Sequence, residues 1–144
     1  MPGVVVSVEN NQVVFTAVKK FTLRHKRLIN TYKAHLKNIF KGVTAGHSYV
    51  LKICSGHFPM NVALKGKNLE VKNLFGETIP RVLEIPEGAQ VKVEGDKINV
   101  TGIDKELVSR CAAGIEQLTR RPGFDKRVFQ DGAYIIEKDG RPIA

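Results

Sequence analysis

The apolar positions at the start of the chain alternate, and this pattern predicts a β-hairpin. The segment VVVSV at residues 4–8 leads to Asn10 and Asn11, and QVVFTA follows as the return strand. Asparagine tolerates the positive φ that two-residue hairpin turns require. We therefore expect two short antiparallel strands before residue 18.

Between residues 23 and 41 the apolar spacing becomes that of a helix. Apolar side chains recur every three or four residues, at Leu28, Ile29, Tyr32, Leu36, Ile39 and Phe40. Thr22 or a close neighbour is the expected start, and Gly42 is the expected stop. A second face, within about 80° at 100° per residue, collects Lys26, Asn30, Lys33, Lys37 and Lys41.

After Gly46 short strands are predicted at SYVLKIC, MNVAL and NLEVKNL, separated by glycine, proline and asparagine. QVKVE and KINVT then form a second hairpin across Gly95 and Asp96. Asp104 is the expected N-cap of a second helix that ends near Thr119, and a cation-rich loop and the strand AYIIE follow. Strands closed by one helix indicate an α+β fold with an antiparallel sheet covered on one face.

The two hairpins are copies of one unit. Residues 6–17 align without a gap with residues 91–102, an offset of 85, and a helical pattern follows each copy. We expect two small repeated α+β domains, at residues 1–43 and 44–144. The first has only a hairpin and a helix, and chains below about 40 residues rarely bury enough surface to fold alone. It should therefore depend on the second domain, on a partner, or on both.

The charge of the chain is unevenly distributed. Hydrophobic residues make up 42% and charged residues 26%, as in folded domains, but the net charge is +9. Residues 1–69 carry 11 Lys or Arg against one acid, Glu9, whereas residues 70–144 carry 12 against 13. An excess of this kind favours a polyanionic partner.

Two clusters of cations are the candidate nucleic-acid contacts. The first comprises Lys19, Lys20, Arg24, His25, Lys26, Arg27, Lys33, Lys37 and Lys41, and the second comprises Arg120, Arg121, Lys126 and Arg127. A merely solvated helix usually mixes charge signs, but residues 10–69 contain no acid. Phosphate binding is therefore favoured, with RNA preferred over DNA because no helix-turn-helix spacing is evident. Phe58 and Phe124 are candidates for stacking on bases, with loop packing as the alternative.

No catalytic signature is evident, because the chain lacks GxxxxGK[ST], GxGxxG after a strand, HExxH and GxSxG. Its histidines and cysteines do not have metal-ligand spacing, so we expect neither an enzyme nor a cofactor or metal. Cys54 and Cys111 are predicted to be reduced, buried thiols. No apolar run approaches the roughly 18–20 residues of a membrane span, and no signal peptide is evident, which predicts a cytosolic protein. Membrane-surface binding is disfavoured because the apolar stripe is needed for the core.

Ordered motifs over nearly all 144 residues resemble one family. They are VENNQVV before the basic helix, KNIFKGVTAGHSYVLK, GHFPMNV, LEVKNLFGE with IPRVLEIPEG, and DKRVFQDGAYI. The chain resembles the large-subunit ribosomal protein L-six family, in its archaeal and eukaryotic form called L-nine. The resemblance implies two similar α+β domains, binding to ribosomal RNA near the sarcin-ricin loop and the factor-binding region, and no catalysis.

By position, the resemblance implies that two groups of cations contact RNA, from Arg24 to Lys41 and from Arg120 to Arg127. The implied partners are large-subunit ribosomal RNA and neighbouring ribosomal proteins in the cytoplasm, and direct contact with translation factors stays open. Family members begin with additional residues ahead of the position of Val4, so a shortened first domain is expected. A protein-interaction module that docks through the apolar stripe of the first helix, and a non-ribosomal RNA-binding protein, are the alternatives.

Overall fold

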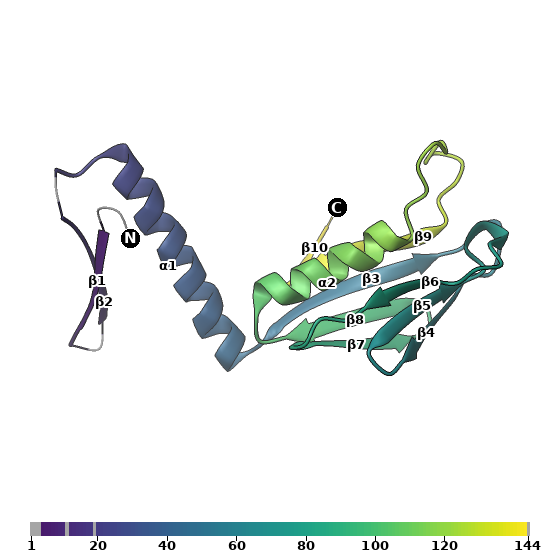
Figure 1. The fold of residues 1–144 in the computed structure, drawn as a ribbon, viewed down its shortest axis with the longest axis horizontal. Helices are drawn as coiled ribbons and strands as arrows, with labels where there is room; N and C mark the ends of the chain where they lie inside the picture. The colour runs from purple at the N-terminus through teal and green to yellow at the C-terminus, as the bar shows by residue number, and fades with distance from the viewer. Residues whose placement is uncertain (1–3, 11, 19, 144) are drawn as a thin grey trace. The chain divides into compact units, whose positions relative to one another are not determined.

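The computed structural model describes residues 4–10, 12–18 and 20–143, which form two compact units, Met1–Phe40 and Lys41–Ala144 (Figure 1). The division falls within a long helix, α1 (Leu23–Thr44). Unit 1 therefore contains most of this helix, and its last turn belongs to unit 2. The sequence-based boundary between residues 43 and 44 stays a prediction.

Unit 1 consists of the predicted hairpin and helix. Strands β1 (Val4–Glu9) and β2 (Gln12–Ala17) pair antiparallel, with Val4 opposite Ala17 and Val8 opposite Val13. The Phe15 ring of β2 stacks on Tyr32 of α1, with 6.2 Å between ring centroids. The hairpin turn includes Asn10 at φ 49°, as expected, and Asn11 lies outside the described residues. This ring contact joins the hairpin to the helix, whereas Val6 and Val8 remain 46% and 74% exposed.

The start of α1 is confirmed at Thr22. The carbonyl of Thr22 accepts from the amide of Lys26 at 3.1 Å, and the Thr22 amide donates to Nδ1 of His25 at 3.2 Å. The first bond is an ordinary helical one, and the second gives the Thr22 amide, just before the helix, a side-chain partner three residues on, as in a capping box. His25 is thus part of a helix cap, a role that the charge pattern did not indicate.

The prediction that Gly42 stops the helix is wrong. The helix continues to Thr44, and Gly46, at φ 74°, ends it by donating to the carbonyls of Lys41 and Gly42 at 3.2 and 3.1 Å. Gly42 is buried, and a Cβ there would lie 2.0 Å from the carbonyl oxygen of Ile103. Its missing side chain serves close packing, whereas the left-handed conformation that favours glycine occurs at Gly46.

Unit 2 contains two antiparallel sheets. The five-stranded sheet has the order β10-β9-β3-β8-β7, formed by β3 (His47–Cys54), β7 (Ala89–Glu94), β8 (Lys97–Gly102), β9 (Gly132–Lys138) and β10 (Arg141–Pro142). The three-stranded sheet is formed by β4 (Asn61–Lys65), β5 (Asn68–Lys72) and β6 (Arg81–Glu84), and the 3-10 helix η1 (Leu74–Gly76) connects β5 to β6. Strands β6 and β10 were not predicted, and neither was the division of the strands into two sheets.

Helix α2 (Lys105–Leu118) lies along the five-stranded sheet (Figure 1). As predicted, the Asp104 side chain caps it by accepting from the amide of Glu106 at 2.8 Å, and the helix ends at Thr119. The core unites this helix with both sheets through fully buried side chains, including Leu51, Ile98, Val108, Ile115 and Leu69. The α+β class, with one helix packed on antiparallel strands, is confirmed.

The cysteine prediction is correct for only one of the two thiols. Both cysteines are free, and Cys111 is buried in the core under α2. Burial raises the pKa of the Cys111 thiol. Cys54, at the last position of β3, is only partly buried.

The internal repeat is confirmed at the level of strand register. Adding 85 to the β1–β2 pairs Val4↔Ala17 and Val8↔Val13 gives the β7–β8 pairs Ala89↔Gly102 and Val93↔Ile98. The copies differ in what surrounds them. Strand β3 pairs with β8 and extends the second hairpin into a five-stranded sheet, whereas in the described part of unit 1 the sheet has only β1 and β2.

Candidate nucleic-acid interface

Five cations of α1 form the first candidate surface, which we call the helix cations: Arg24, Lys26, Arg27, Lys33 and Lys37. All five side chains are exposed, whereas the stripe Leu28, Ile29, Tyr32 and Leu36 is partly buried. Tyr32 of this stripe contacts Phe15 of the hairpin, and the charged positions are left to solvent. Ile39 and Phe40, also predicted as part of the stripe, are 58% and 62% exposed.

The helix cations lack acidic partners. Glu9 is the one acid in residues 1–40, and its carboxylate is hydrogen bonded to Ser7 on the hairpin. Among the described residues, none of the five forms an ion pair. Like charges on one helix repel one another, which destabilises an isolated helix. A bound polyanion would remove that repulsion.

The other candidates near α1 have different surroundings. Lys20 is exposed just before the helix, and Lys19 lies outside the described residues. His25 caps the helix, as described above. Lys41 pairs with Asp139 at 2.5 Å, and the same carboxylate contacts Nδ1 of the buried His47 at 3.0 Å. Lys41 therefore already has a counter-charge in unit 2.

The carboxylate of Asp139 holds the last turn of α1 against the turn between β9 and β10. Burial alone would raise the pKa of Asp139, but hydrogen bonds and charge interactions with Lys41 and His47 lower it below its ordinary value. Gly42, in the same turn of the helix, packs against Ile103. These contacts hold residues 41–44, the part of α1 that belongs to unit 2, within that unit.

The second candidate surface is the segment between α2 and β9, residues 120–131, which we call the basic loop. Arg81 of β6 holds its start, since Nη1 donates to the carbonyls of Leu118 and Arg120 at 2.6 and 3.2 Å. The same guanidinium binds both carboxylate oxygens of Glu77, at 2.7 and 2.8 Å. Its hydrogen bonds lower the pKa of Glu77, and the pKa of Arg81 is raised in turn. Arg81 was not among the predicted site residues.

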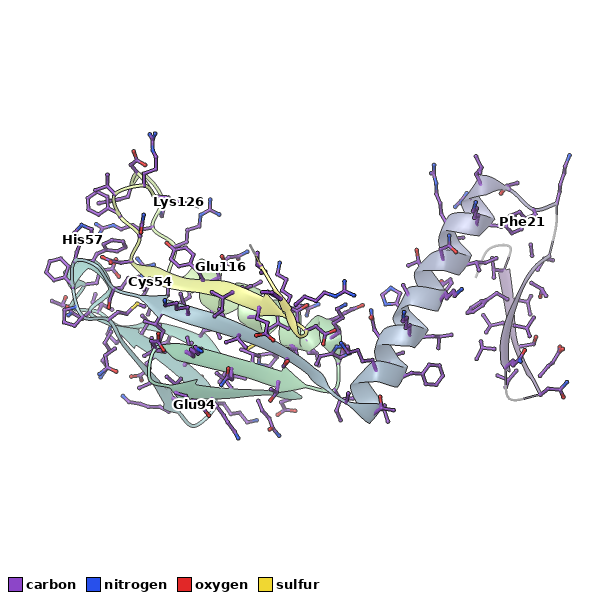
Figure 2. The ribbon with its side chains drawn as sticks, turned by 180° about the vertical axis from the view of Figure 1, so that it is seen from behind. Phe21, Cys54, His57, Glu94, Glu116 and Lys126 are labelled. Carbon is purple, nitrogen blue, oxygen red and sulfur yellow. The ribbon has the colours of Figure 1, made fainter. Side chains whose placement is uncertain are left out.

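The end of the basic loop is held by Asp131, which is 4% exposed. Its carboxylate accepts from the amides of Gly56 and His57, and it contacts Nδ1 of His57 at 3.0 Å. Burial by itself would raise the pKa of Asp131, but these hydrogen bonds and the His57 ring lower it below its ordinary value. The loop between β3 and β4 is therefore joined to the basic loop, at the end of unit 2 where Figure 2 labels His57 and Lys126.

Aromatic rings pack inside this junction. Phe129 is stacked on His57, with 5.1 Å between centroids, and meets Phe124 edge to face at 4.8 Å. Phe75 of η1 lies 5.9 Å from Phe124. The guanidinium of Arg121 lies 4.2 Å from the ring centre of Phe124, within range of a cation–π interaction. Phe124 is thus packed against other residues of the loop and η1 in this structure.

The four predicted loop cations differ in their exposure and in whether another side chain of the protein already contacts them. Arg120 and Lys126 are exposed, and Arg121 is partly buried over Phe124. Arg127 is exposed but lies 3.2 Å from Asp125, whose side chain also accepts from the Arg127 amide. These hydrogen bonds from Arg127 lower the pKa of Asp125. Arg120 and Lys126 are the two whose charges are most available to an RNA phosphate.

Replacing Asp131 by asparagine is expected to destabilise the chain by about 1–3 kcal/mol at pH 7, since a charge-assisted set of hydrogen bonds is weakened. Because its folded pKa is lowered, Asp131 contributes stability above its unfolded pKa of about 3.9, and the contribution is lost as pH falls through the folded pKa. The variant should therefore lose less stability between pH 5 and acid than the parent.

Urea unfolding at a series of pH values measures this difference. Asp125→Asn is the matched control, because Asp125 is in the same loop but exposed, and little change is expected at pH 7. Equal effects of the two substitutions would contradict the anchoring role of Asp131.

Metal binding and membrane insertion are two other properties on which the described residues bear. In residues 4–10, 12–18 and 20–143, no group of three or more His, Cys, Asp or Glu side chains is arranged to hold a metal ion. None of the helices described is long and apolar enough to cross a membrane.

Comparison with known proteins decides the family. The family described as Ribosomal protein L6 matches residues 58–132. Large ribosomal subunit protein uL6 of Methanococcus vannielii is 43% identical over 144 residues, which cover 99% of this chain and 78% of the relative. The chain belongs to the ribosomal protein L6 family. The protein of the same name from Methanosarcina mazei is 42% identical over 137 residues, 95% of this chain and 77% of the relative.

The region that matches the L6 family model includes the second candidate surface, the basic loop. The matched region contains the basic loop, Arg81 and Glu77, so the contacts that hold the start of the loop fall within the family segment, whereas Gly56 and His57, which bind Asp131, lie just before it. A protein of the L6 family is a structural ribosomal protein, not an enzyme. The predicted resemblance to this family is confirmed.

Proposed function

We propose that the chain is a structural constituent of the large ribosomal subunit that binds ribosomal RNA through the helix cations and the basic loop. The observation that carries the proposal is the acid-free, exposed cationic face of α1. Phosphates release condensed counterions when they meet such a surface, and this drives binding without base recognition. The names of both relatives, which are large-subunit proteins, support the same assembly.

The proposed binding region lies near the sarcin-ricin loop and the factor-binding region of the large subunit, as the resemblance of the sequence motifs implies. In this arrangement unit 2 is the folded scaffold. Its core, with a sheet and helix of its own, supports the basic loop at fixed points through Arg81 and Asp131. Unit 1 contributes mainly the helix cations, and the bound RNA helps to hold unit 1 in place. The protein then works in the cytoplasm, beside neighbouring ribosomal proteins.

A nuclease experiment distinguishes this function from that of a protein-interaction module. The purified full chain is bound to large subunits, and the complexes are treated with ribonuclease and separated by size. RNA-mediated association should be lost, so the chain should be released as a free protein of 16.0 kDa. A chain that binds no RNA itself and remains fully associated with another protein after complete RNA digestion would overturn the proposal in favour of the module.

A further inference from the structure

The basic loop encloses a cavity of about 250 Å³ beside the C-terminal half of α2. This volume is slightly below the roughly 300–1,000 Å³ typical of small-ligand pockets. Three kinds of side chain line it, and they come from different elements. The aromatic residues are Phe75, Phe124 and Phe129, the cations are Arg120, Arg121 and Lys126, and Glu116, Gln117 and Tyr134 are polar.

We infer that this cavity receives one unstacked nucleotide of the bound RNA, with its base against the aromatic wall and its phosphate among the loop cations. The inference rests on the proposed function and adds a binding mode to it. Proteins that recognise single-stranded RNA stack bases on aromatic rings or on arginine planes. Both occur here together, because Arg121 lies over Phe124.

Contacts within the protein hold the aromatic wall of the cavity in place. Phe129 is held between His57 and Phe124, and Asp131, which also lines the cavity, fixes the loop end through buried hydrogen bonds. Arg81 binds the carbonyl of Leu118, the last residue of α2, and so satisfies one acceptor at the negative end of the helix dipole, next to the proposed phosphate position. A preorganised site of this kind loses less conformational entropy when it binds.

Glu116 indicates that the site does more than bind an anion. Figure 2 labels Glu116 on α2 and Lys126 on the loop, and both line the cavity. The Glu116 carboxylate forms no ion pair among the described residues, although three cations line the same cavity. A carboxylate weakens a site built only for phosphate, but it accepts hydrogen bonds from the amino group of a base such as cytosine.

Tyr134 of β9 adds a donor to the cavity. Burial raises the pKa of its hydroxyl, and the nearby Cys54, Asp131 and Glu116 raise it further. The hydroxyl therefore keeps its proton at neutral pH and is available to an acceptor on the base. A base with both an amino group and a ring acceptor, such as cytosine, would satisfy Glu116 and Tyr134 together.

The test is a titration of the ¹⁵N-labelled full chain, followed by NMR, with cytidine 5′-monophosphate, uridine 5′-monophosphate or inorganic phosphate at matched ionic strength. We expect saturable shifts of the amides around the cavity with both nucleotides, and tighter binding of the cytidine form. Inorganic phosphate should bind more weakly at the same amides. Equal affinity for phosphate and nucleotides would overturn the inference and leave an anion site alone.

Two variants separate base stacking from charge. Phe124→Leu should weaken nucleotide binding at least about fivefold, the lower end for one base stacked on an aromatic ring. Phe58→Leu is the control, because Phe58 is 48% exposed and does not line the cavity. Glu116→Gln should reduce the preference for cytidine over uridine, even if removal of the negative charge tightens phosphate binding, and Glu84→Gln should not. An unchanged preference in Glu116→Gln, or equal effects of the two phenylalanine substitutions, would contradict base recognition here.

Failure of this inference differs from failure of the proposed function. If no nucleotide binds at the cavity while the chain binds large-subunit RNA in a manner that depends on Lys33 and Lys37, only the inference is wrong. If a nucleotide binds at the cavity but large-subunit RNA does not bind the chain, the proposed function is wrong and the nucleotide site stands.

Discussion

Replacing Lys33 and Lys37 together by glutamate is expected to weaken binding of the chain to large-subunit RNA on the order of 25–60-fold at about 0.1 M salt. Each lost phosphate contact lowers the slope of log K against log[salt] by roughly 0.7–0.9. Over a tenfold salt range, from about 0.1 to 1 M, two contacts therefore contribute roughly 25–60-fold in affinity, and the double variant loses this contribution. The slope of the variant should therefore be smaller by roughly 1.4–1.8. Filter binding of the full chain across a salt series measures both quantities.

The matched control reverses Lys65 and Lys67, which changes the net charge by the same amount. These two side chains are exposed, but they pair with Glu70 and Glu87 at 2.8 and 2.7 Å, so they are not expected to contact phosphate. A smaller loss of affinity and a nearly unchanged slope are expected. Equal slopes for the two double variants would show that α1 contributes only general charge and is not an RNA-binding face.

Gly42→Ala is expected to destabilise the chain by about 1–3 kcal/mol or more, even though alanine favours a helix by about 1 kcal/mol over glycine. The new Cβ would lie 2.0 Å from the Ile103 carbonyl oxygen and 3.1 Å from its carbon. Both are backbone atoms, so the helix itself must shift, and the Lys41 and His47 contacts with Asp139 must shift with it. Thermal and urea unfolding measure the change.

Gly114→Ala in α2 is the control with the opposite expected sign. A Cβ there would meet Cδ2 of Leu83 at 3.4 Å, an ordinary contact with a flexible side chain. This variant should be stabilised by up to about 1 kcal/mol through helix propensity. If Gly42→Ala were equally stabilising, the last turn of α1 would not be packed against Ile103 as described.

The elements with clear periodicity were predictable from the sequence. Both hairpins, the start of α1 at Thr22 and the Asp104 cap of α2 follow from local spacing and capping residues. The end of α1 was predicted at the wrong glycine, because Gly42 allows close packing whereas Gly46 ends the helix. The sequence shows neither the close approach of Ile103, 61 positions away in the numbering, nor the positive φ of Gly46.

The candidate site was predictable as a charge pattern but not as a structure. The exposure of the helix cations agrees with their spacing, whereas Arg121 lies over an aromatic ring and Lys41 pairs with Asp139. Asp131 and His57 lie 74 residues apart, and no local signal joins them. An acid within a cationic loop, such as Asp131, was the one hint that the loop is anchored rather than free.

Sedimentation with the large subunit tests the central claim most directly. The full chain is mixed with large ribosomal subunits that lack their own copy of the L6 protein and is separated on a sucrose gradient at moderate salt. We predict that it migrates with the subunits, and that the Lys33 and Lys37 double reversal leaves a larger share at the top of the gradient than the Lys65 and Lys67 control does. If the unaltered chain stays at the top while the subunits sediment, the account of a ribosomal RNA-binding protein is wrong.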